Sequence, residues 1–232
     1  MTQPISAYLT DLARKLIARG LTEGVLLGDW GFQVGSGGYN PLDPTDVLDV
    51  DPSLQALLAP IGSIRPLGRV RDSGVGASAS LTAETGVIQI DGLLAIPDAV
   101  SNRYLTIDGA VSANLNGTWP IRQWLSSTSV TISAPLVTDA DAGPLTWELR
   151  DLLTFKPNPS ASDFHGRLSE VDEPGVEVAE VAIFCRVLLV PAVPVYPLPV
   201  PVGTRLLFAN AHFTPFIKDT NMVANFHVCV QV

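Results

Sequence analysis

The sequence predicts a mainly β fold of the α+β class, and three observations support this prediction. Charged residues make up only 16% of the 232 residues, against roughly 25% in typical soluble domains. A composition this poor in charge is typical of strand-rich chains and of chains that bury surface in an assembly. The nineteen prolines and nineteen glycines favour strands and turns over long helices. Short β-branched segments also recur between turn signals such as Asn116-Gly117.

The length and the charge exclude several classes of protein. A chain of 232 residues forms one large or two small domains and buries a core without disulfide or metal staples. Cys185 and Cys229 are too few for a disulfide framework. The net charge of −9 and the lack of a basic stripe argue against nucleic-acid binding. No apolar run reaches about 18 residues and the N-terminus lacks a secretory pattern, so we expect no membrane insertion and folding in a cytoplasm.

The chain is predicted to begin with a helix over residues about 4–19. Apolar residues recur there at intervals of three and four, which forms one apolar stripe, and Gly20 is placed as a C-terminal cap. The prolines and the Asn40-Pro41 step predict an irregular segment over residues 39–44. The apolar stripe consists of Ile5, Tyr8, Leu9, Leu12 and Leu16. The other elements expected here are a strand over 25–34, a glycine turn over 35–38, a helix over 51–58 and a strand over 61–71.

The composition of the chain changes at about residue 72. Residues 72–83 are mostly Ser, Gly and Ala and are predicted to form a linker or long loop. A run of short strands follows, and we interpret residues 84–149 as a small inserted β-sandwich. The host domain is then discontinuous, over residues 1–72 and 150–232, because insertion at an exposed loop is how a domain commonly accepts a guest. The strands expected in the insert are 86–90, 104–107, 119–125, 129–133 and 145–149.

The C-terminal part of the sequence predicts further strands of the host domain. Residues 176–189 predict a long, mainly apolar strand that carries charges at Glu177, Glu180 and Arg186. Five prolines within residues 190–202 predict an extended polyproline-like segment or a solvent-facing edge, because proline cannot donate a hydrogen bond to a sheet. Closing strands are expected over 205–211 and 225–232.

Two kinds of polar cluster have a structural explanation that is simpler than a binding site. The glycine turn at residues 35–38 lacks the spacing and the lysine of a phosphate-binding loop, and a turn with positive φ explains it better. Four aspartates could bind calcium, which takes several oxygen ligands, but their spacing matches no EF-hand loop. Helix caps and a solvated turn explain these aspartates and the acidic group at 170–173 better. The residues concerned are Asp43, Asp46, Asp49 and Asp51, and Glu170, Asp172 and Glu173.

The histidines and cysteines do not form a convincing catalytic or metal motif. His227 and Cys229 share one face of the last expected strand; with Cys185 they could form part of a zinc site, or alone a Cys-His dyad. No CxxC or HxxxH spacing supports a metal, and buried apolar cysteines are the simpler interpretation. His165 and His212 lie near no catalytic motif. We therefore expect no catalytic residue, no cofactor, no cofactor-binding residue and no metal ligand.

Three tryptophans lie within the expected insert. A row of exposed aromatic side chains would indicate sugar binding, whereas a small β-sandwich commonly uses one or two tryptophans in its core. Core packing is therefore the favoured interpretation, and sugar binding stays an alternative. The tryptophans are Trp119, Trp124 and Trp147.

Four short motifs, ordered along the chain, carry a resemblance to a known family. The first is the expected N-terminal helix followed by VGSGGYNP at residues 34–41. The others are GVEVAEVAIF at 175–184, GTRLLFANA at 203–211 and the aromatic-x-Lys segment at 216–219. Together they resemble the phage tail-collar fibre family, in which a helix leads to a glycine-rich turn and two later apolar strands follow. The expected insert, with NLNGTWPI at 114–121, is similar to small β-domains of phage structural proteins.

The resemblance implies a structural role without chemistry. In that family the module joins a fibre to the baseplate within a symmetric oligomer. It implies a virion protein of the tail fibre or baseplate, assembled in the host bacterial cytoplasm, with other tail or baseplate proteins and tail fibres as partners. It also implies a homo-oligomer, a dimer or a trimer. Family members usually carry the module at the start of a long fibre, and no fibre follows Val232, so we expect an adaptor or a short baseplate component.

Two further hypotheses stay open at this point. A receptor- or carbohydrate-binding tail module would use residues 84–150 to bind sugar, and it predicts that Trp119 or Trp124 is exposed. A cysteine hydrolase would use Cys229 and His227, and it predicts a reactive Cys229 thiol in the folded protein.

Overall fold

The computed structural model describes residues 5–23, 25–96, 103–135, 137–151, 161–168, 172, 174–189 and 200–231. Its described residues form strands and one helix, which confirms the expected mainly β fold class. The chain divides into two compact units, unit 1 (residues 1–67 and 153–232) and unit 2 (residues 68–152). Unit 1 is thus formed from both ends of the sequence, with unit 2 between them along the chain.

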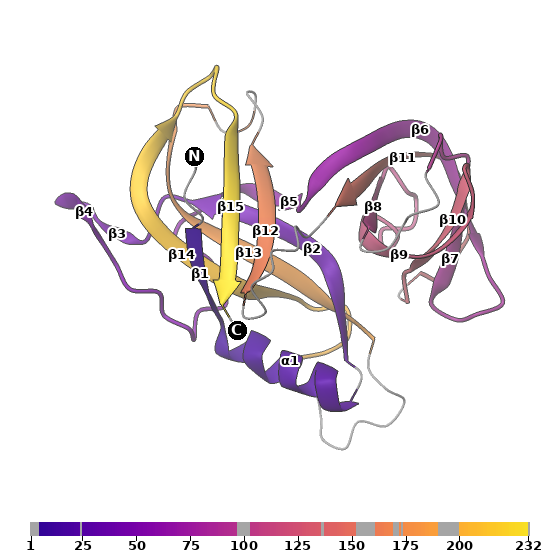
Figure 1. Cartoon of the computed structure of the whole chain (residues 1–232), viewed down its shortest axis with the longest axis horizontal. Helices are drawn as coiled ribbons and strands as arrows, with labels where there is room; N and C mark the ends of the chain where they lie inside the picture. Colours follow the sequence, from indigo (N-terminus) through magenta and orange to yellow (C-terminus); the bar gives the residue numbers. More distant parts are fainter. Residues whose placement is uncertain are drawn as a thin grey trace. The chain divides into compact units, whose positions relative to one another are not determined.

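Unit 1 is a seven-stranded sheet with one helix and a two-stranded hairpin (Figure 1). Its elements are β1 (Ile5–Leu9), α1 (Asp11–Glu23), β2 (Leu26–Gly35), β3 (Tyr39–Asn40), β4 (Asp43–Val47), β5 (Pro60–Pro66), β12 (Ala161–Leu168), β13 (Val176–Leu189), β14 (Arg205–Lys218) and β15 (Ala224–Gln231). The strand order in the sheet is β12-β15-β1-β14-β13-β2-β5. β1 pairs parallel to β15 and antiparallel to β14, so the N-terminal strand separates the last two strands.

The expected helix over residues 4–19 is wrong at both of its ends. Its first part is β1, where Ala7 and Leu9 are buried while Tyr8 between them is 58% exposed. α1 then starts at Asp11 and continues through Gly20, which does not end it. Ile5 and Leu9 fit both periods, but the period of two adds Ala7 to the buried face and leaves Tyr8 exposed. The strand is favoured because β14 and β15 supply hydrogen-bond partners on both of its sides.

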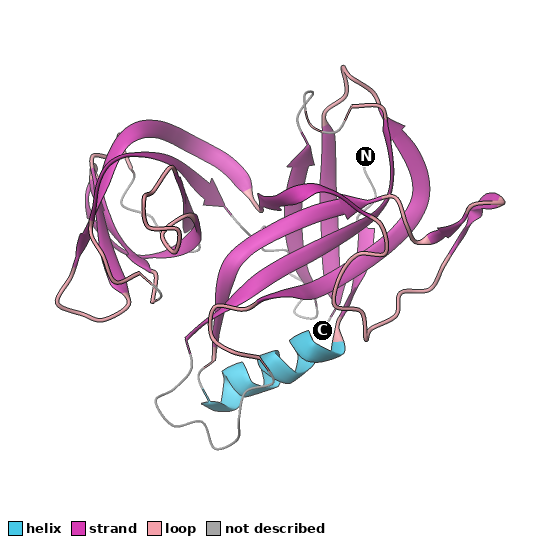
Figure 2. Ribbon diagram, turned by 180° about the vertical axis from the view of Figure 1, so that it is seen from behind, coloured by secondary structure: helices cyan, strands magenta, loops and turns pink. Residues whose placement is uncertain are grey.

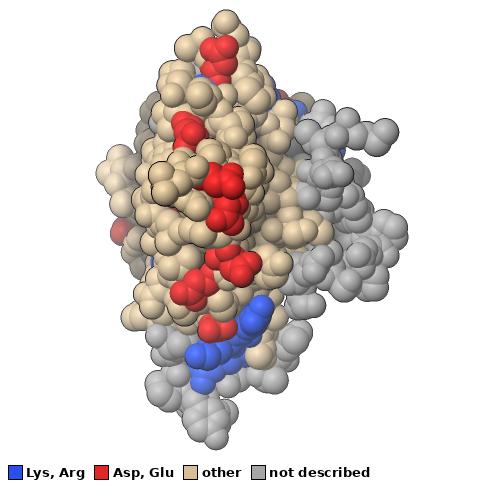
Figure 3. Space-filling model, turned by 90° about the vertical axis from the view of Figure 1, so that its left-hand side faces the viewer, with Lys and Arg blue, Asp and Glu red and all other residues tan. Residues whose placement is uncertain are grey.

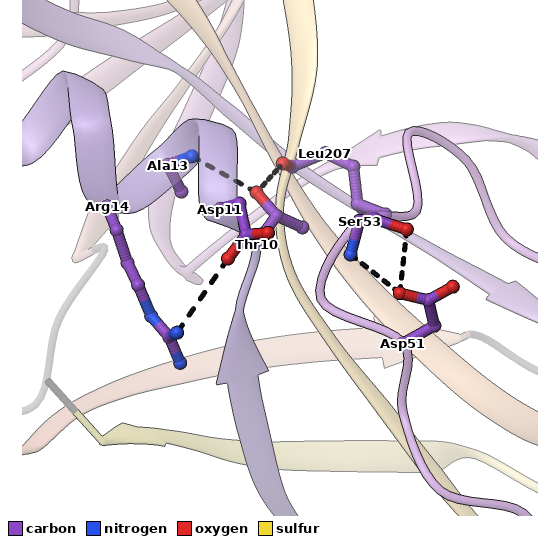
Figure 4. A network of polar contacts seen from close by, with 7 residues as sticks. All are labelled: Thr10, Asp11, Ala13, Arg14, Asp51, Ser53 and Leu207. Atoms are coloured by element: carbon purple, nitrogen blue, oxygen red, sulfur yellow. Dashed lines mark hydrogen bonds and ion pairs between the residues drawn. The ribbon is translucent and has the colours of Figure 1, made fainter.

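Thr10 sets the start of α1 (Figure 4). Its hydroxyl accepts a hydrogen bond from the Ala13 N–H at 3.1 Å and donates one to the Leu207 carbonyl at 2.8 Å. The Thr10 side chain is buried, and Ala13 is fully buried beside it. The hydroxyl therefore caps the helix and joins it to β14 at the same time.

Replacing Thr10 by alanine is expected to lower the free energy of unfolding by about 2 kcal/mol, because the cap is lost and the Leu207 carbonyl loses its partner. Thr10→Ser is the matched control: it keeps the hydroxyl, removes one methyl group and is expected to cost less than about 1 kcal/mol. Urea denaturation of the two variants measures both values. Equal losses would show that the hydroxyl is not the cause.

The sheet of unit 1 curls back on itself around an aromatic interior. Four strands separate β12 from β2 in the sheet order, yet the rings of Phe164 and Trp30 lie 5.4 Å apart. Phe208 packs against both rings, at 4.9 Å from Trp30 and 6.2 Å from Phe164. Gly166 on β12 leaves room for the Phe32 ring, which a Cβ would approach to 2.9 Å. These rings bring large apolar areas into the curl and so hold its two sides together.

A long segment between β2 and β5 covers one face of β13 and β14. We call residues 36–59 the covering segment, and it contains the β3–β4 hairpin. Leu57 of this segment is 5% exposed and packs with Ala182, Phe184 and Leu207 in one apolar cluster. The covering segment is thus held partly by burial of apolar surface.

Two expectations about the covering segment are wrong. The helix expected over 51–58 is a series of turns, because the Asp51 carboxylate accepts hydrogen bonds from the Ser53 N–H at 2.8 Å and hydroxyl at 2.7 Å. This local bonding competes with a helix and stabilises a turn instead. The irregular segment expected over 39–44 contains β3 and the start of β4. Pro44 is tolerated in β4 because it lies at the register shift between the two strands and is not paired with a residue of β3.

Unit 2 is a closed six-stranded barrel, so the expected β-sandwich is wrong. Its strands are β6 (Arg69–Leu81), β7 (Val87–Asp91), β8 (Arg103–Asp108), β9 (Gly117–Ser126), β10 (Ser129–Ser133) and β11 (Asp141–Asp151). The order around the barrel is β10-β7-β6-β11-β8-β9, and β9 pairs with β10 to close it. The sheet closes because the long strand β6 pairs with β7 on one side and with β11 on the other. Figure 2 shows the strands of this unit from the opposite side.

The linker expected over residues 72–83 is wrong, because these residues form most of β6. Ala77 and Ala79 are buried while Ser80 is exposed, which is the alternation of a barrel strand. Gly74 lies so close to the Trp147 ring that a Cβ would approach it to 2.9 Å. The small residues that suggested a loop instead leave room for large side chains of other strands.

Two expected strands, over 61–71 and 176–189, have different outcomes in the structure. The single strand expected over 61–71 is divided between β5 and β6, because Gly68 takes a positive φ of 96° and turns the chain. The long strand expected over 176–189 is confirmed as β13. Most of the proline-rich segment over 190–202 lies outside the described residues.

Candidate functional site

A buried carboxylate on β13 is the centre of the most elaborate polar cluster in unit 1. Glu180 is 0% exposed. Its Oε1 accepts hydrogen bonds from the Ala59 N–H at 2.8 Å and the Gly37 N–H at 3.2 Å. Its Oε2 accepts one from the Leu58 N–H at 3.2 Å. Both ends of the covering segment are therefore bound to one side chain, and the three backbone donors replace the water that a carboxylate loses on burial.

The glycine turn at residues 35–38 is explained by this carboxylate. A Cβ at Gly37 would lie 2.9 Å from Glu180 Oε1 and 2.7 Å from Leu58 Cβ. Gly38 takes a positive φ of 86° and lies against the His212 ring. The turn thus receives an anion through a backbone N–H, as a phosphate loop does, but the anion is a side chain of the same protein.

His212 joins the middle of the covering segment to the same cluster. Its Nδ1 lies 2.9 Å from the Leu48 carbonyl oxygen, and its Nε2 lies 3.7 Å from Glu180 Oε2. Nε2 is buried and makes no hydrogen bond among the described residues. The Leu48 carbonyl oxygen is an acceptor, so this short contact requires the proton of the ring on Nδ1.

The base of the β3–β4 hairpin has its own polar contacts. The Tyr39 hydroxyl donates a hydrogen bond to the Glu177 carboxylate on β13, and this bond raises the pKa of Tyr39. Asn40 Nδ2 donates to Asp46 Oδ2 at 3.2 Å across the hairpin. The Asp43 carboxylate accepts from the hydroxyl and N–H of Thr45, and these bonds lower the pKa of Asp43. The hairpin is thus ordered by contacts at its base and within its turn.

The hairpin projects from the sheet at the end where β2 finishes, as Figures 1 and 2 show. Residues 41–46 are all exposed, and Leu42 at the tip is 96% exposed. Figure 3 shows a row of acidic side chains on the face that the hairpin points toward, ending beside basic side chains. An ordered projection with an apolar tip and acidic flanks is suited to contact another molecule. The exposed aspartates of the covering segment are Asp43, Asp46, Asp49 and Asp51.

The calcium site considered for these aspartates has no support in the geometry. Asp43 is bonded to Thr45, Asp46 to Asn40 and Asp51 to Ser53. No group of three His, Cys, Asp or Glu side chains within the described part of the chain is arranged to hold a metal ion.

A second charged cluster lies at the far end of β2 and β13. Arg186 and Arg205 are directly paired across β13 and β14, an arrangement that is unfavourable for like charges. Asp29, which is 4% exposed, lies 3.2 Å from Arg186 Nη2 and forms an ion pair with Arg205. Asp29 takes a positive φ of 49° at a register shift between β2 and β13, which turns its carboxylate toward the two guanidinium groups. This cluster was not expected from the sequence.

The three residues considered for a zinc site lie on two strands that are not neighbours in the sheet. Cys185 lies on β13, whereas His227 and Cys229 lie on β15, with β14 and β1 between the two strands. Burial and the nearby Asp29 carboxylate raise the pKa of the Cys185 thiol well above its usual value, so this thiol is protonated and unreactive. His165 pairs in register with His227 on β12 and β15, and its side chain lies outside the described part of the structure.

The tryptophans of unit 2 serve mainly as core. Trp119 and Trp147 are 0% and 1% exposed, and Trp119 Nε1 donates to the Leu115 carbonyl at 2.7 Å. Trp124 is half-buried, and its Nε1 donates to the Ile96 carbonyl at 3.1 Å. These three side chains therefore form no exposed aromatic row.

Asp141 organises one end of the barrel. Its carboxylate accepts hydrogen bonds from the Gly143 N–H at 3.0 Å and the Val111 N–H at 2.8 Å. These bonds hold the pKa of Asp141 below its usual value. Val111 is 94% exposed at this end of the barrel, so the carboxylate fixes a loop that carries an apolar side chain into solvent.

The depressed pKa of Asp141 predicts a stability contribution that depends on pH. A carboxyl group whose folded pKa is low stabilises the protein fully above its unfolded pKa of about 3.9, and this contribution is lost as the pH falls through the folded pKa. Urea denaturation of wild type and Asp141→Asn should therefore differ at pH 7 and converge in acid below about pH 4. A difference that stays constant over this range would contradict the assignment.

Comparisons with protein-family models, with curated proteins and with solved structures each found no match. The helix α1 is neither long nor apolar enough to cross a membrane, and the described residues contain no other helix. The strongest feature of the structure is an ordered, exposed hairpin within a covering segment whose two ends are bound by the buried carboxylate of Glu180.

Proposed function

We propose that the chain is a structural component of a phage virion, in the tail fibre or baseplate, that attaches fibres to the baseplate. The observation that supports this proposal most is the pairing of two motifs that carry the family resemblance. The glycine turn at residues 35–38 and the strand at 176–184 pack on each other, and Glu180 of the strand binds the turn. Short motifs separated by about 140 residues in the sequence thus form one local structure.

The proposed role is mechanical and assigns no chemistry to the chain. Strand-mediated contacts and a projecting hairpin are suited to joining subunits in a particle. The low charge content of 16% also fits a chain that buries surface in an assembly. On this proposal the partners are tail or baseplate proteins and fibres, the chain forms a dimer or trimer, and it resides in the virion after assembly in the host cytoplasm.

Co-purification tests the proposed role. An affinity-tagged chain, co-expressed with the proteins encoded on either side of its gene, is expected to retain a tail, baseplate or fibre protein. Gold labelling of the tag on particles from the host that carries the gene should then mark the tail. Leu42→Asp places a negative charge at the hairpin tip. Leu94→Asp places the same charge on unit 2, at a leucine that is 60% exposed, and is the control for added surface charge. Particles without label and a tagged chain that retains no tail protein would contradict the proposal.

A further inference from the structure

Within the described part of the chain, the Arg186 and Arg205 pair has more hydrogen-bond donors and positive charge than the surrounding groups use. Two guanidinium groups share the single carboxylate of Asp29, which leaves a formal charge of +1 in this cluster. Arg186 Nε is buried and has no hydrogen-bond acceptor among the described residues. The side chains of Arg186 and Arg205 are 20% and 33% exposed, so both are reached from solvent. Their planar donor groups fit a carboxylate better than any other common protein group.

The β3–β4 hairpin has the complementary chemistry. It carries Asp43 and Asp46, both exposed, and no Lys or Arg lies within residues 36–59. Each carboxylate can accept several hydrogen bonds, so their contacts to Thr45 and Asn40 leave acceptor capacity at the surface. Leu42, between the two strands, adds an exposed apolar group next to these charges.

The hairpin cannot reach the arginine pair of its own chain. It emerges from the end of β2 at Gly35, which pairs with Glu180, whereas Arg186 lies six residues further along β13. At about 3.3 Å per residue, this places the arginine pair about 20 Å from the base of the hairpin. The hairpin also projects away from the sheet at its own end (Figure 1). A contact between the two surfaces therefore has to join different molecules.

The geometry points to a heterologous contact in which the acidic β3–β4 hairpin of one copy binds Arg186 and Arg205 of the next copy. This inference rests on the proposed structural role, since it names the surfaces through which copies assemble. The two surfaces differ and lie at opposite ends of the sheet, so the contact runs head to tail. Repeated head-to-tail contacts close into a ring when the rotation between copies permits it, which is the arrangement that a ring-shaped particle component requires.

Sedimentation velocity over a range of concentrations tests the contact. The wild-type chain is expected to self-associate, and the double variant Asp43→Lys/Asp46→Lys is expected to weaken association at least about tenfold, because the lysines face arginines. The control Asp108→Lys/Asp139→Lys makes the same charge change at exposed aspartates of unit 2 and should leave association unchanged. A hairpin variant that associates like wild type overturns the inference.

A mixing experiment tests which surfaces meet. The Arg205→Glu chain is also expected to lose self-association, and mixing it with the hairpin variant should restore a hetero-oligomer, because lysines of one chain then meet the glutamate of the other. Circular dichroism and the urea midpoint establish that each variant is folded. If Arg205→Glu does not fold, Arg205→Gln takes its place beside the hairpin variant. Self-association of both variants that equals that of the wild type overturns the contact.

The outcomes separate this contact from the proposed function. A wild-type chain that is monomeric at all concentrations but co-purifies with a tail protein overturns the contact and leaves the virion role standing. A chain that self-associates through the hairpin but retains no tail protein supports the contact and removes the support for the virion role.

Discussion

Replacing Glu180 by alanine is expected to lower the free energy of unfolding of unit 1 by about 3–5 kcal/mol. The variant leaves the N–H groups of Gly37, Leu58 and Ala59 without the acceptor that binds them in the wild type. These donors are partly buried, so leaving them without a partner is costly, and the loss also frees both ends of the covering segment. The expected result in urea is a lower midpoint with an unchanged slope, together with faster hydrogen exchange in residues 36–59.

Two control variants separate charge from shape at this position. Glu180→Gln keeps the size and one carbonyl acceptor but turns an amide donor toward backbone donors, so it should cost less than alanine but still about 2 kcal/mol. Glu84→Ala removes an exposed glutamate of unit 2 that pairs with Arg122 at the surface, and such pairs contribute at most about 1 kcal/mol. If Glu180→Ala is no more harmful than Glu84→Ala, the carboxylate does not hold the covering segment.

Replacing Trp119 by alanine is expected to unfold unit 2 selectively, with a loss of about 3–5 kcal/mol. Trp119 is 0% exposed, and its Nε1 satisfies the Leu115 carbonyl, so the variant creates a cavity and leaves a buried acceptor without its donor. Hydrogen exchange followed by mass spectrometry is the suitable measurement, because it resolves the two units. Peptides from residues 103–151 should lose protection, whereas peptides from β13 should keep it.

Trp124→Ala is the matched control for the tryptophan prediction. Trp124 is half-buried on the same strand, β9, so its loss should cost clearly less than that of Trp119. Equal loss of protection in both units after Trp119→Ala would contradict independent unfolding of the barrel.

The sequence predicted elements well where one structural period dominated. The apolar run that forms β13 and the alternation of Ser129–Ser133, which forms β10, allow one interpretation each, and both strands are present. Residues 5–9 allow two interpretations, because Ile5 and Leu9 fit both a helical period and a period of two. The choice is made by β14 and β15, which are about 200 residues away in the sequence, and local patterns carry no information on such partners.

Small residues misled the interpretation of β6 for a related reason. A segment of Ser, Gly and Ala has little to bury by itself and resembles a linker. In the barrel, its small side chains leave space for larger ones: Gly74 lies against the ring of Trp147, which is 1% exposed. The barrel requires small residues on one strand because large ones on other strands fill its interior. Only the closed arrangement reveals this requirement.

The sequence indicated some residues of the candidate site but not how they bind one another. Glu180 is one of three charges in a mainly apolar strand, and a buried charge needs several partners. That signal could have indicated a carboxylate bound by backbone donors, and the glycine turn could have supplied them. Asp29 gave no such signal, because the register shift that turns it toward Arg186 and Arg205 depends on how β2 and β13 pair.

The position of β1 has a consequence for the order in which the protein folds during synthesis. β1 is made before the other strands of its sheet, whereas the two strands that flank it, β14 and β15, are made after all the other strands of that sheet. Unit 2 is contiguous and is complete by about residue 152, so its barrel can form while the rest of the chain is still being made. Until β13, β14 and β15 have been made, the part of unit 1 that precedes the barrel exposes its apolar surface. During that time the nascent chain is most open to aggregation or to binding by a chaperone. A completed barrel in the middle of the chain would hold the two waiting halves of the sheet within reach of each other.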